Sequence, residues 1–361
     1  MPRLPRAAAL ALSLALLIGL VAWWPARAQT PATPAAPAAP AAPAQPAAPA
    51  EAPAGAAAEP AAAQPAPTPA AAQPATPAAD PKAVTSEVVR GPVGVIRNEG
   101  GNIGVLSGPD GILLVDAGFA RQAEPIRAAL QELAAGSDAA GSAAAGSDPR
   151  LLVSTHFHAD HSDGNAGFVA TGALLVAHDN THRHLAEGSM IEALQQVIPP
   201  ADPAHLPLIT IEQDLRLRLN GDTIDLLHLP AAHTDGDLIV RFRNADVIHV
   251  ADVWFNGMYP FIDSRHGATL AGAIAAVDRV LELAGDDTRI IPGHGPVAGR
   301  SELAAYRTML ATVQGRLNAL KAQGFTLPQV LEARPLADLE ATWGQGMFKG
   351  DRWLELIWNA V

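Results

Sequence analysis

Cysteine is absent from the 361 residues of this sequence. Disulfide bonds, thiolate metal ligands and cysteine nucleophiles are therefore excluded. A chain without disulfides depends on a sufficiently large hydrophobic core, and the roughly 280 residues of mixed composition that follow the N-terminal region are enough to build one.

Runs of basic residues are also missing. Lys and Arg together number 24 against 36 Asp and Glu, which gives a formal net charge of -12. An acidic chain repels polyanions, so binding to nucleic acid or to an anionic membrane surface is disfavoured. We expect the partner to be a small-molecule substrate and expect no nucleic acid.

Aromatic residues are scarce in the first 83 residues, where Ala and Pro dominate. Arg3 and Arg6 precede an apolar stretch over residues 7–22, and Ala26-Arg27-Ala28 offers a small-x-small cleavage site. This pattern predicts a signal peptide over residues 1–28 and an exported protein, periplasmic or secreted. An uncleaved membrane anchor is the alternative, because about 18 apolar residues can just span a bilayer.

Residues 29–83 form an Ala/Pro tract without apolar periodicity. Its prolines deny it a continuous helix, and such a composition cannot bury a face. The tract is therefore predicted to be a disordered linker that acts as a spacer.

From residue 84 the sequence alternates short β-prone runs with helical segments. Strands are predicted within residues 91–98, 101–107, 112–118, 151–155, 215–219, 222–229, 237–242, 246–253 and 289–295, and helices within residues 121–136 and 269–285 and from Ser301 onward. Two strand-rich halves, each followed by helices, indicate an α/β (α+β) fold of two packed sheets covered by helices. We expect residues 84–300 to form the catalytic domain and residues 301–361 a C-terminal helical extension packed on it.

The segment THFHADH, residues 155–161, directly follows a predicted buried strand. It holds His156, His158, Asp160 and His161, and such side chains are costly to bury unless they are paired or bind a metal. His156 and His158 share one face of an extended segment, whereas Asp160 and His161 turn into the next helix. This spacing suits two metals, which in two-metal sites lie about 3.5–4 Å apart.

Three further residues stand at the ends of other predicted strands: His233 in AAHTDGD, Asp252 in HVADVW and His294 in IPGHGP. Each alone is a weak signal, but the same placement recurs four times with the THFHADH segment. Ligands at the same ends of several strands converge on one edge of a sandwich.

With these motifs the chain resembles the metallo-β-lactamase superfamily over about residues 90–300, and Asp116 in LLVDAG supplies its first motif. The resemblance implies a four-layer αββα sandwich with a dinuclear site at one edge. It places His156, His158 and His233 on one metal and Asp160, His161 and His294 on the other, bridged by Asp252 and supported from behind by Asp116. A bridging Asp is common in family hydrolases of thioesters, lactones and phosphoesters, so the resemblance leaves the substrate open between these and β-lactams.

Two zinc ions are the expected cofactors, because zinc takes imidazole and carboxylate ligands, although iron or manganese fits the same set. The predicted reaction is hydrolysis of a carbonyl-type bond by water activated between the metals, with Asp160 and Asp252 as the catalytic carboxylates. Phe157, Asn256 and Tyr259 flank the ligands and are the candidates for binding substrate. A mononuclear iron enzyme with oxygen or sulfur chemistry and a non-catalytic metal-binding protein are the alternatives.

Overall fold

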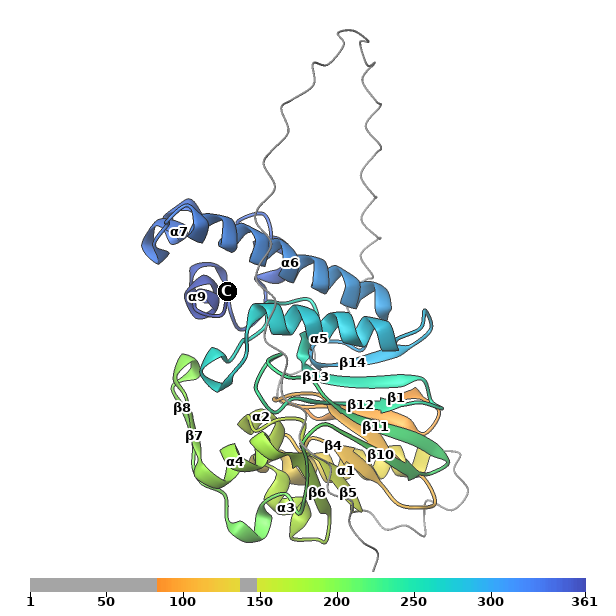
Figure 1. The fold of residues 1–361 in the computed structure, drawn as a ribbon. Coiled ribbons are helices and arrows are strands. Elements are labelled where there is room, and N and C mark those ends of the chain that lie inside the picture. The colour runs from red at the N-terminus through yellow and green to blue at the C-terminus, as the bar shows by residue number, and fades with distance from the viewer. Residues whose placement is uncertain (1–82, 137–147) are drawn as a thin grey trace, which may run out of the picture. The chain divides into compact units, whose positions relative to one another are not determined.

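Two β-sheets lie face to face in the computed structural model, which describes residues 83–136 and 148–361 (Figure 1). The predicted signal peptide, residues 1–28, and nearly all of the predicted linker lie outside the described residues. Among the described residues, no helix has both the length and the apolar character needed to cross a membrane.

The first sheet has the strand order β1-β2-β3-β4-β5-β6-β9. Pairing is antiparallel from β1 to β4 and parallel from β4 to β9. Its strands are β1 (Thr85–Arg90), β2 (Val93–Arg97), β3 (Ile103–Leu106), β4 (Leu113–Val115), β5 (Leu151–Val153), β6 (Leu174–His178) and β9 (Ile209–Ile211). The parallel strands send their carboxyl ends to one edge, which is the edge that carries the candidate ligands.

The second sheet runs in the order β10-β11-β12-β13-β14, and its last pair is parallel. Its strands are β10 (Asp214–Leu219), β11 (Asp222–His228), β12 (Leu238–Phe242), β13 (Val247–Phe255) and β14 (Arg289–His294). Asn220 and Gly221 connect β10 to β11 with φ angles of 54° and 73°. Both angles are positive, as a two-residue type I′ turn requires, and the hairpin predicted from this Asn-Gly pair is confirmed.

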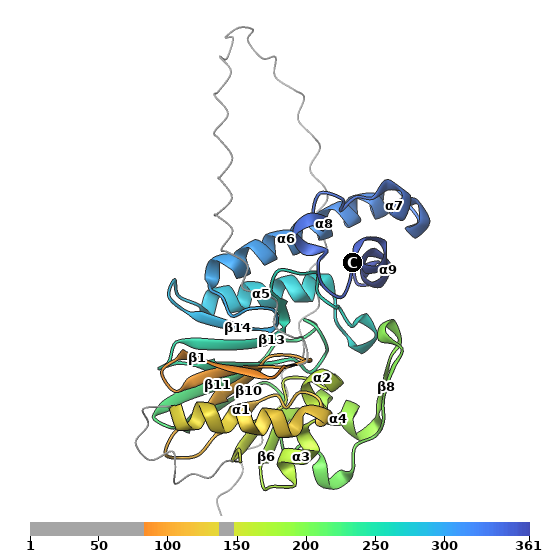
Figure 2. The same ribbon diagram turned by 180° about the vertical axis from the view of Figure 1, so that it is seen from behind.

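Helices cover the outer face of each sheet, so the molecule has four layers (Figures 1 and 2). The helix α1 (Ala123–Gly136) packs on the first sheet, and α5 (Leu270–Leu283) and α6 (Arg300–Ala322) pack on the second. Three separate cores fill the spaces between layers, and the central one takes its Val, Leu and Ile side chains from both sheets. The predicted αββα sandwich is confirmed.

Sequence periodicity explains the long helix α6. Leu303, Tyr306, Leu310, Val313 and Leu317 recur at three- and four-residue steps and are all buried. Glu302 Oε2 accepts a hydrogen bond from the backbone N–H of Gly299 at 3.2 Å, and the helix begins at Arg300, one residue before the predicted Ser301.

The C-terminal region predicted as a helical extension continues with α7 (Leu327–Ala333), α8 (Glu340–Trp343) and α9 (Gly350–Ile357). Trp353 on α9 is fully buried, stacks on Tyr259 with ring centroids 3.9 Å apart, and donates a hydrogen bond to the carbonyl of Pro260. Residues 301–361 therefore pack on the preceding residues and share one core with α5 and β13.

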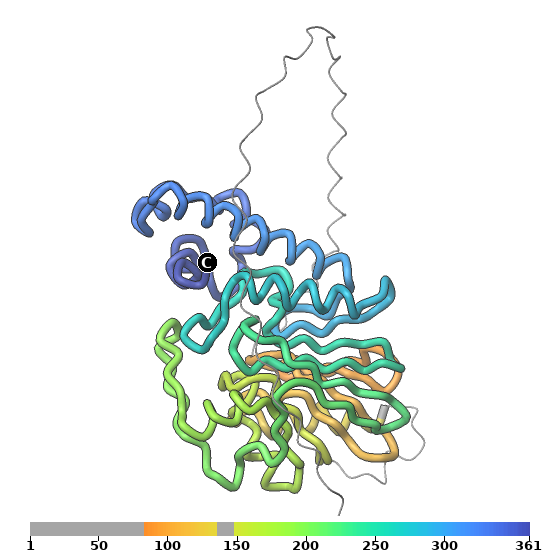
Figure 3. Tube along the Cα trace, viewed as in Figure 1, coloured from red at the N-terminus to blue at the C-terminus, as the bar shows by residue number. Residues whose placement is uncertain are grey.

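Smaller elements surround the edge with the candidate ligands. The helices α2 (Ala159–Ser162), α3 (Asn165–Val169) and α4 (Asp179–Glu187) follow β5 and β6. A two-stranded hairpin, β7 (Ser189–Ile191) and β8 (Gln196–Ile198), runs beside them, and in Figure 3 the tube of this hairpin stands apart from the two large sheets.

Candidate metal centre

The seven predicted ligands meet at one edge of the sandwich, although they come from both sheets. Four of them follow or end a strand: His156 and His158 come after β5, His233 after β11, and His294 ends β14. Asp160 and His161 lie on α2, where the chain turns immediately after the two extended histidines. The structure therefore brings together the residues that the motif spacing selected.

Asp252 lies within β13 rather than at its end, and a backbone irregularity directs it into the site. Ala251 has a positive φ of 44°, and the register between β13 and β14 shifts on both sides of it. Such bulges redirect side chains next to functional sites. Gly293 on β14 makes room, because a Cβ there would lie 2.0 Å from Asp252 Oδ1.

The seven residues divide into two groups, each with ligand atoms within 4.8 Å of one another. The first group is His156, His158, His233 and Asp252, and all four are buried. The second group is Asp160, His161 and His294. These are the same two sets that the family resemblance implied.

Asp252 faces both groups, one carboxylate oxygen toward each. Its Oδ2 lies 3.3 Å from His233 Nε2 and 4.0 Å from His156 Nε2. Its Oδ1 lies 3.0 Å from His161 Nε2 and 3.4 Å from His294 Nε2. A carboxylate in this position can bridge two cations.

Hydrogen bonds on the far side of four imidazole rings fix which nitrogen faces the centre. His161 Nδ1 donates to Asp116 Oδ2 (2.8 Å), His233 Nδ1 to the carbonyl of Phe261 (2.8 Å) and His158 Nε2 to Asp263 Oδ2 (3.0 Å). Thr155 Oγ1 donates to Asp116 Oδ2 and can accept from His156 Nδ1 (3.1 Å). Each ring then presents a nitrogen lone pair to the site, as a metal-binding imidazole must.

Two of these nitrogens lie so close together that a proton or a metal ion between them would stabilise the arrangement. His233 Nε2 and His158 Nδ1 are 2.8 Å apart, and with the outer nitrogens protonated neither carries a hydrogen. His156 Nε2, His161 Nε2 and Asp252 Oδ1 are buried without a hydrogen-bond partner of suitable geometry. Buried polar atoms in this state are rare unless an ion or water satisfies them. The donor set therefore fits a site for metal ions.

The pKa values of the metal-free site show that the two groups differ in charge. Burial lowers the pKa of His233 to about 4, and burial together with the neighbouring imidazoles lowers that of His156. Burial also opposes protonation of His294, but Asp252 and Asp160 outweigh it and raise its pKa to about 9. The same balance of burial against Asp252, Asp160 and Asp116 raises the pKa of His161. Without metals, protons therefore occupy the carboxylate-rich second group.

Asp116, the predicted support, is fully buried beneath the site. Besides the ring of His161, it accepts hydrogen bonds from the backbone N–H and the hydroxyl of Thr155. The carboxylate thus fixes both the start of the THFHADH segment and one of its imidazoles.

Two of the three predicted substrate-binding residues lie in the core. Phe157 and Tyr259 have relative exposures of 0% and 1%. Phe157 alternates with His156 and His158 and so points to the opposite side, where it packs against His184 and His266. Tyr259 stacks on Trp353. Asn256 is partly exposed, its backbone N–H donates to the carbonyl of His294, and its role in substrate binding stays a prediction.

Sequence reasoning missed Asp263, whose carboxylate contacts the ligand His158. It follows β13 by eight residues and ends the segment FNGMYPFID, which resembles a secreted branch of the family but was not read as a source of ligand contacts. The histidines with helical spacing on and before α4 do not join the centre: His178 stacks on His228 with centroids 3.7 Å apart, and His184 hydrogen-bonds Asp235.

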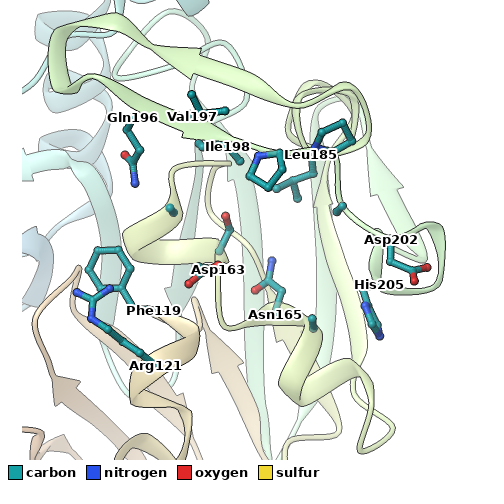
Figure 4. Close-up of a pocket in the computed structure, with 16 residues that line it drawn as sticks. Phe119, Arg121, Asp163, Asn165, Leu185, Gln196, Val197, Ile198, Asp202 and His205 are labelled. Atoms are coloured by element: carbon teal, nitrogen blue, oxygen red, sulfur yellow. The ribbon is translucent and has the colours of Figure 1, made fainter.

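A pocket of about 390 Å³ lies beside the ligand-bearing helix α2 (Figure 4). Leu185, Val197 and Ile198 form an apolar wall, and Phe119 and Arg121 face it across the opening. Asp163 and Asn165 supply acceptors, and Asn165 Oδ1 is buried without a hydrogen-bond partner. Ala159 and Ser162 of α2 line the pocket, whereas none of the seven candidate ligands does.

A four-layer αββα sandwich with a two-group His/Asp site at one edge defines a class of metal-binding proteins. The chain belongs to the metallo-β-lactamase superfamily, whose family model matches residues 96–294, more than half of the sequence. No curated protein matches the chain.

Solved structures with the same fold include enzymes of different activity. A metallo-β-lactamase from Cronobacter sakazakii with a HARLDQ motif is 20% identical, with a TM-score of 0.52, over 67% of this chain and 97% of that one. The stereoselective inverting sec-alkylsulfatase Pisa1 from Pseudomonas sp. is 19% identical, with a TM-score of 0.51, over 69% of this chain. The match spans 45% of the alkylsulfatase chain. At these identities the likeness shows the fold alone.

Proposed function

We propose that the protein is a dinuclear metal-dependent hydrolase that cleaves a carbonyl-type bond of a small molecule, with zinc as its metal. This proposal rests mainly on the position of the Asp252 carboxylate. One of its oxygens faces His156 and His233, and the other faces His161 and His294. A mononuclear enzyme would not need both sets of ligands complete. Two divalent cations bound here would supply Lewis acidity and a water whose pKa is lowered to about 7.

The three carboxylates at the site differ in exposure, and we assign their roles accordingly. The side chain of Asp160 is 26% exposed, against 5% for Asp252. We assign to Asp160 the orientation of the attacking water, because its carboxylate is accessible to solvent and substrate. Asp252 holds the two groups at a fixed separation, and Asp116 keeps His161 oriented through its Nδ1.

The pocket beside α2 is the proposed place for a substituent of the substrate. Its apolar wall excludes water from that substituent, and the carboxylate of Asp163 can accept hydrogen bonds from its N–H or O–H groups. Pockets for small molecules commonly combine an apolar lining with a few such polar groups.

Export of the protein is a separate proposal and rests on the N-terminal sequence pattern of residues 1–28. Mass spectrometry of the protein recovered from outside the cytoplasm tests it. A mature chain that begins at Gln29 supports cleavage, and an intact Met1 in the membrane fraction supports the anchor instead.

The decisive experiment combines metal analysis with a panel of substrates for the full chain. The panel holds a chromogenic cephalosporin, a carbapenem, a lactone, a thioester, a phosphoester and a secondary alkyl sulfate. We expect two zinc ions per chain and chelator-sensitive turnover that His158→Ala abolishes. His182→Ala, which removes a histidine of α4 outside both groups, is the matched control and is expected to retain activity.

The same measurements separate the alternatives. A single iron per chain with no hydrolysis would favour oxygen or sulfur chemistry. Two bound metals without turnover on any substrate class would favour a non-catalytic metal-binding protein. Turnover of the sulfate alone would move the proposed reaction from carbonyl to sulfate-ester hydrolysis.

A further inference from the structure

Asp263 is a buried carboxylate outside the seven predicted ligands, and its side chain accepts a hydrogen bond from one of them. The residue is 3% exposed. Its Oδ2 accepts a hydrogen bond from His158 Nε2 at 3.0 Å and another from His266 Nδ1 at 2.7 Å. Asp263 Oδ2 thus connects His158, a ligand of the first group, with His266, which belongs to neither group.

The backbone around Asp263 contacts a second ligand of the same group. The N–H of Asp263 donates to the carbonyl of His233 at 3.2 Å. Two residues earlier, the carbonyl of Phe261 accepts from His233 Nδ1 at 2.8 Å. The short segment from Phe261 to Asp263 therefore holds His158 and His233, the two rings whose inward nitrogens lie 2.8 Å apart.

This arrangement repeats, in the first group, what Asp116 does in the second. Asp116 Oδ2 accepts from His161 Nδ1 at 2.8 Å, and Asp116 is also fully buried. In both cases an ionised carboxylate behind the ring fixes the tautomer, so that the opposite nitrogen is free to bind a cation. For His158 that nitrogen is Nδ1, and without Asp263 the ring could protonate Nδ1 or rotate.

We propose that Asp263 is the positioning residue of the first metal group, anchored in turn by His266. The proposal rests on the proposed metal centre but not on the reaction it performs. Asp263 acts through His158 and does not touch the metal, so its loss weakens cation binding at His156, His158 and His233. The second group, held by Asp116, keeps its affinity.

Two background variants isolate the groups, and zinc affinity is measured in each by competition with a chromophoric chelator. His294→Ala disables the second group and reports on the first, whereas His156→Ala disables the first and reports on the second. Asp263→Ala is expected to weaken zinc binding about 10- to 100-fold in the His294→Ala background, the usual effect of removing such a partner. In the His156→Ala background it is expected to leave zinc affinity unchanged.

Two further variants separate positioning from general destabilisation. Asp263→Asn keeps an oxygen that accepts from both imidazoles, and we expect it to recover most of the lost affinity. Asp225→Ala removes an equally buried carboxylate, which accepts from Arg216 and Arg243 on the second sheet, away from the site. We expect Asp225→Ala to lower thermal stability without changing zinc affinity in either background.

An unchanged first-group affinity in Asp263→Ala overturns the proposal, and so does an equal loss in both groups. A wild-type chain that binds no zinc overturns both this proposal and the proposed function. A wild-type chain that binds two zinc ions but hydrolyses nothing contradicts the proposed function alone, and the affinity series still decides the role of Asp263.

Discussion

Gly101, in the loop before β3, lies against the ring of His161. A Cβ at this position would lie 2.0 Å from His161 Cε1, and the ring cannot move aside because it is fully buried and bonded to Asp116. We predict that Gly101→Ala displaces His161 and lowers zinc affinity of the second group by about 10-fold or more, as other disturbances of ligand orientation do. Metal content after dialysis against a weak chelator measures the loss.

Gly167→Ala is the matched control for this substitution. Gly167 lies on α3, and nothing stands within 4 Å of a Cβ built there. Normal metal content in Gly167→Ala and a loss in Gly101→Ala would support the steric argument. Full metal content in Gly101→Ala would contradict it.

Metal binding should depend on pH through the imidazoles of the second group. In the metal-free site the pKa of His294 is raised to about 9, and that of His161 is raised as well. Below about pH 9 the ring of His294 carries a proton that must leave before a cation binds, and the raised pKa of His161 acts in the same direction, so apparent zinc affinity rises as pH increases toward 9. The expected slope is about tenfold per pH unit for each proton released.

Calorimetry in buffers with different protonation enthalpies counts the released protons directly. Zinc titrations between about pH 6 and pH 9 give the slope of the affinity. Binding heats that do not depend on the buffer, together with a flat affinity profile, would contradict the proton displacement.

The metal ligands could be predicted from the sequence, whereas the positions of Phe157 and Asp263 could not. The ligands were predictable because each follows a strand, and the ends of neighbouring strands meet at one edge. Phe157 was assigned to the pocket because it lies between two ligands, but strand alternation turns it away from them into the core. Asp263 was missed because a loop, not a repeating pattern, brings it to His158.

Two glycines on neighbouring helices can show whether helix propensity or steric packing decides the effect of a Gly→Ala substitution. Ala is favoured over Gly in a helix by about 1 kcal/mol. On α5, a Cβ at Gly272 would lie 1.9 Å from the carbonyl oxygen of Ala231, whereas on α6 a Cβ at Gly315 meets nothing within 4 Å. We predict that Gly315→Ala stabilises the protein by up to about 1 kcal/mol and that Gly272→Ala destabilises it.

Thermal or denaturant unfolding of the two variants measures the difference. Ala231 stands two residues before His233, so Gly272→Ala is also expected to lower metal content. Equal stabilisation by both substitutions would mean that α5 shifts away from the Ala231 loop at little cost.

At the level of elements, hydrophobic periodicity and turn residues predicted most of the architecture. The Asn220-Gly221 hairpin and α6 follow from local rules alone. The bulge at Ala251 does not, because an alanine with a φ of 44° carries no sequence signal. That bulge depends on pairing with β14, a contact between segments far apart in the chain.

For the whole molecule, removal of metals should lower thermal stability. A ligand that binds only the folded state stabilises it by about 2.7 kcal/mol when its concentration is 100 times its Kd. Chelation is therefore expected to lower the Tm of the wild type by several degrees and to leave that of His158→Ala much less changed. Calorimetry with and without chelator tests this, and an identical Tm in the wild type would argue against metal binding at the site.

The ligands come from both sheets of the sandwich: His156 and His158 follow β5 of the first, and Asp252 and His294 lie on strands of the second. Bound ions would therefore act as cross-links between the two halves of a chain that has no cysteine to make covalent ones. Unlike a disulfide, such a link exists only while the chain is folded, so it stabilises the folded state by binding and does not restrict the unfolded ensemble. The complete ligand sets form only when both sheets are assembled, so we expect bound ions to favour the closed sandwich over its separated halves.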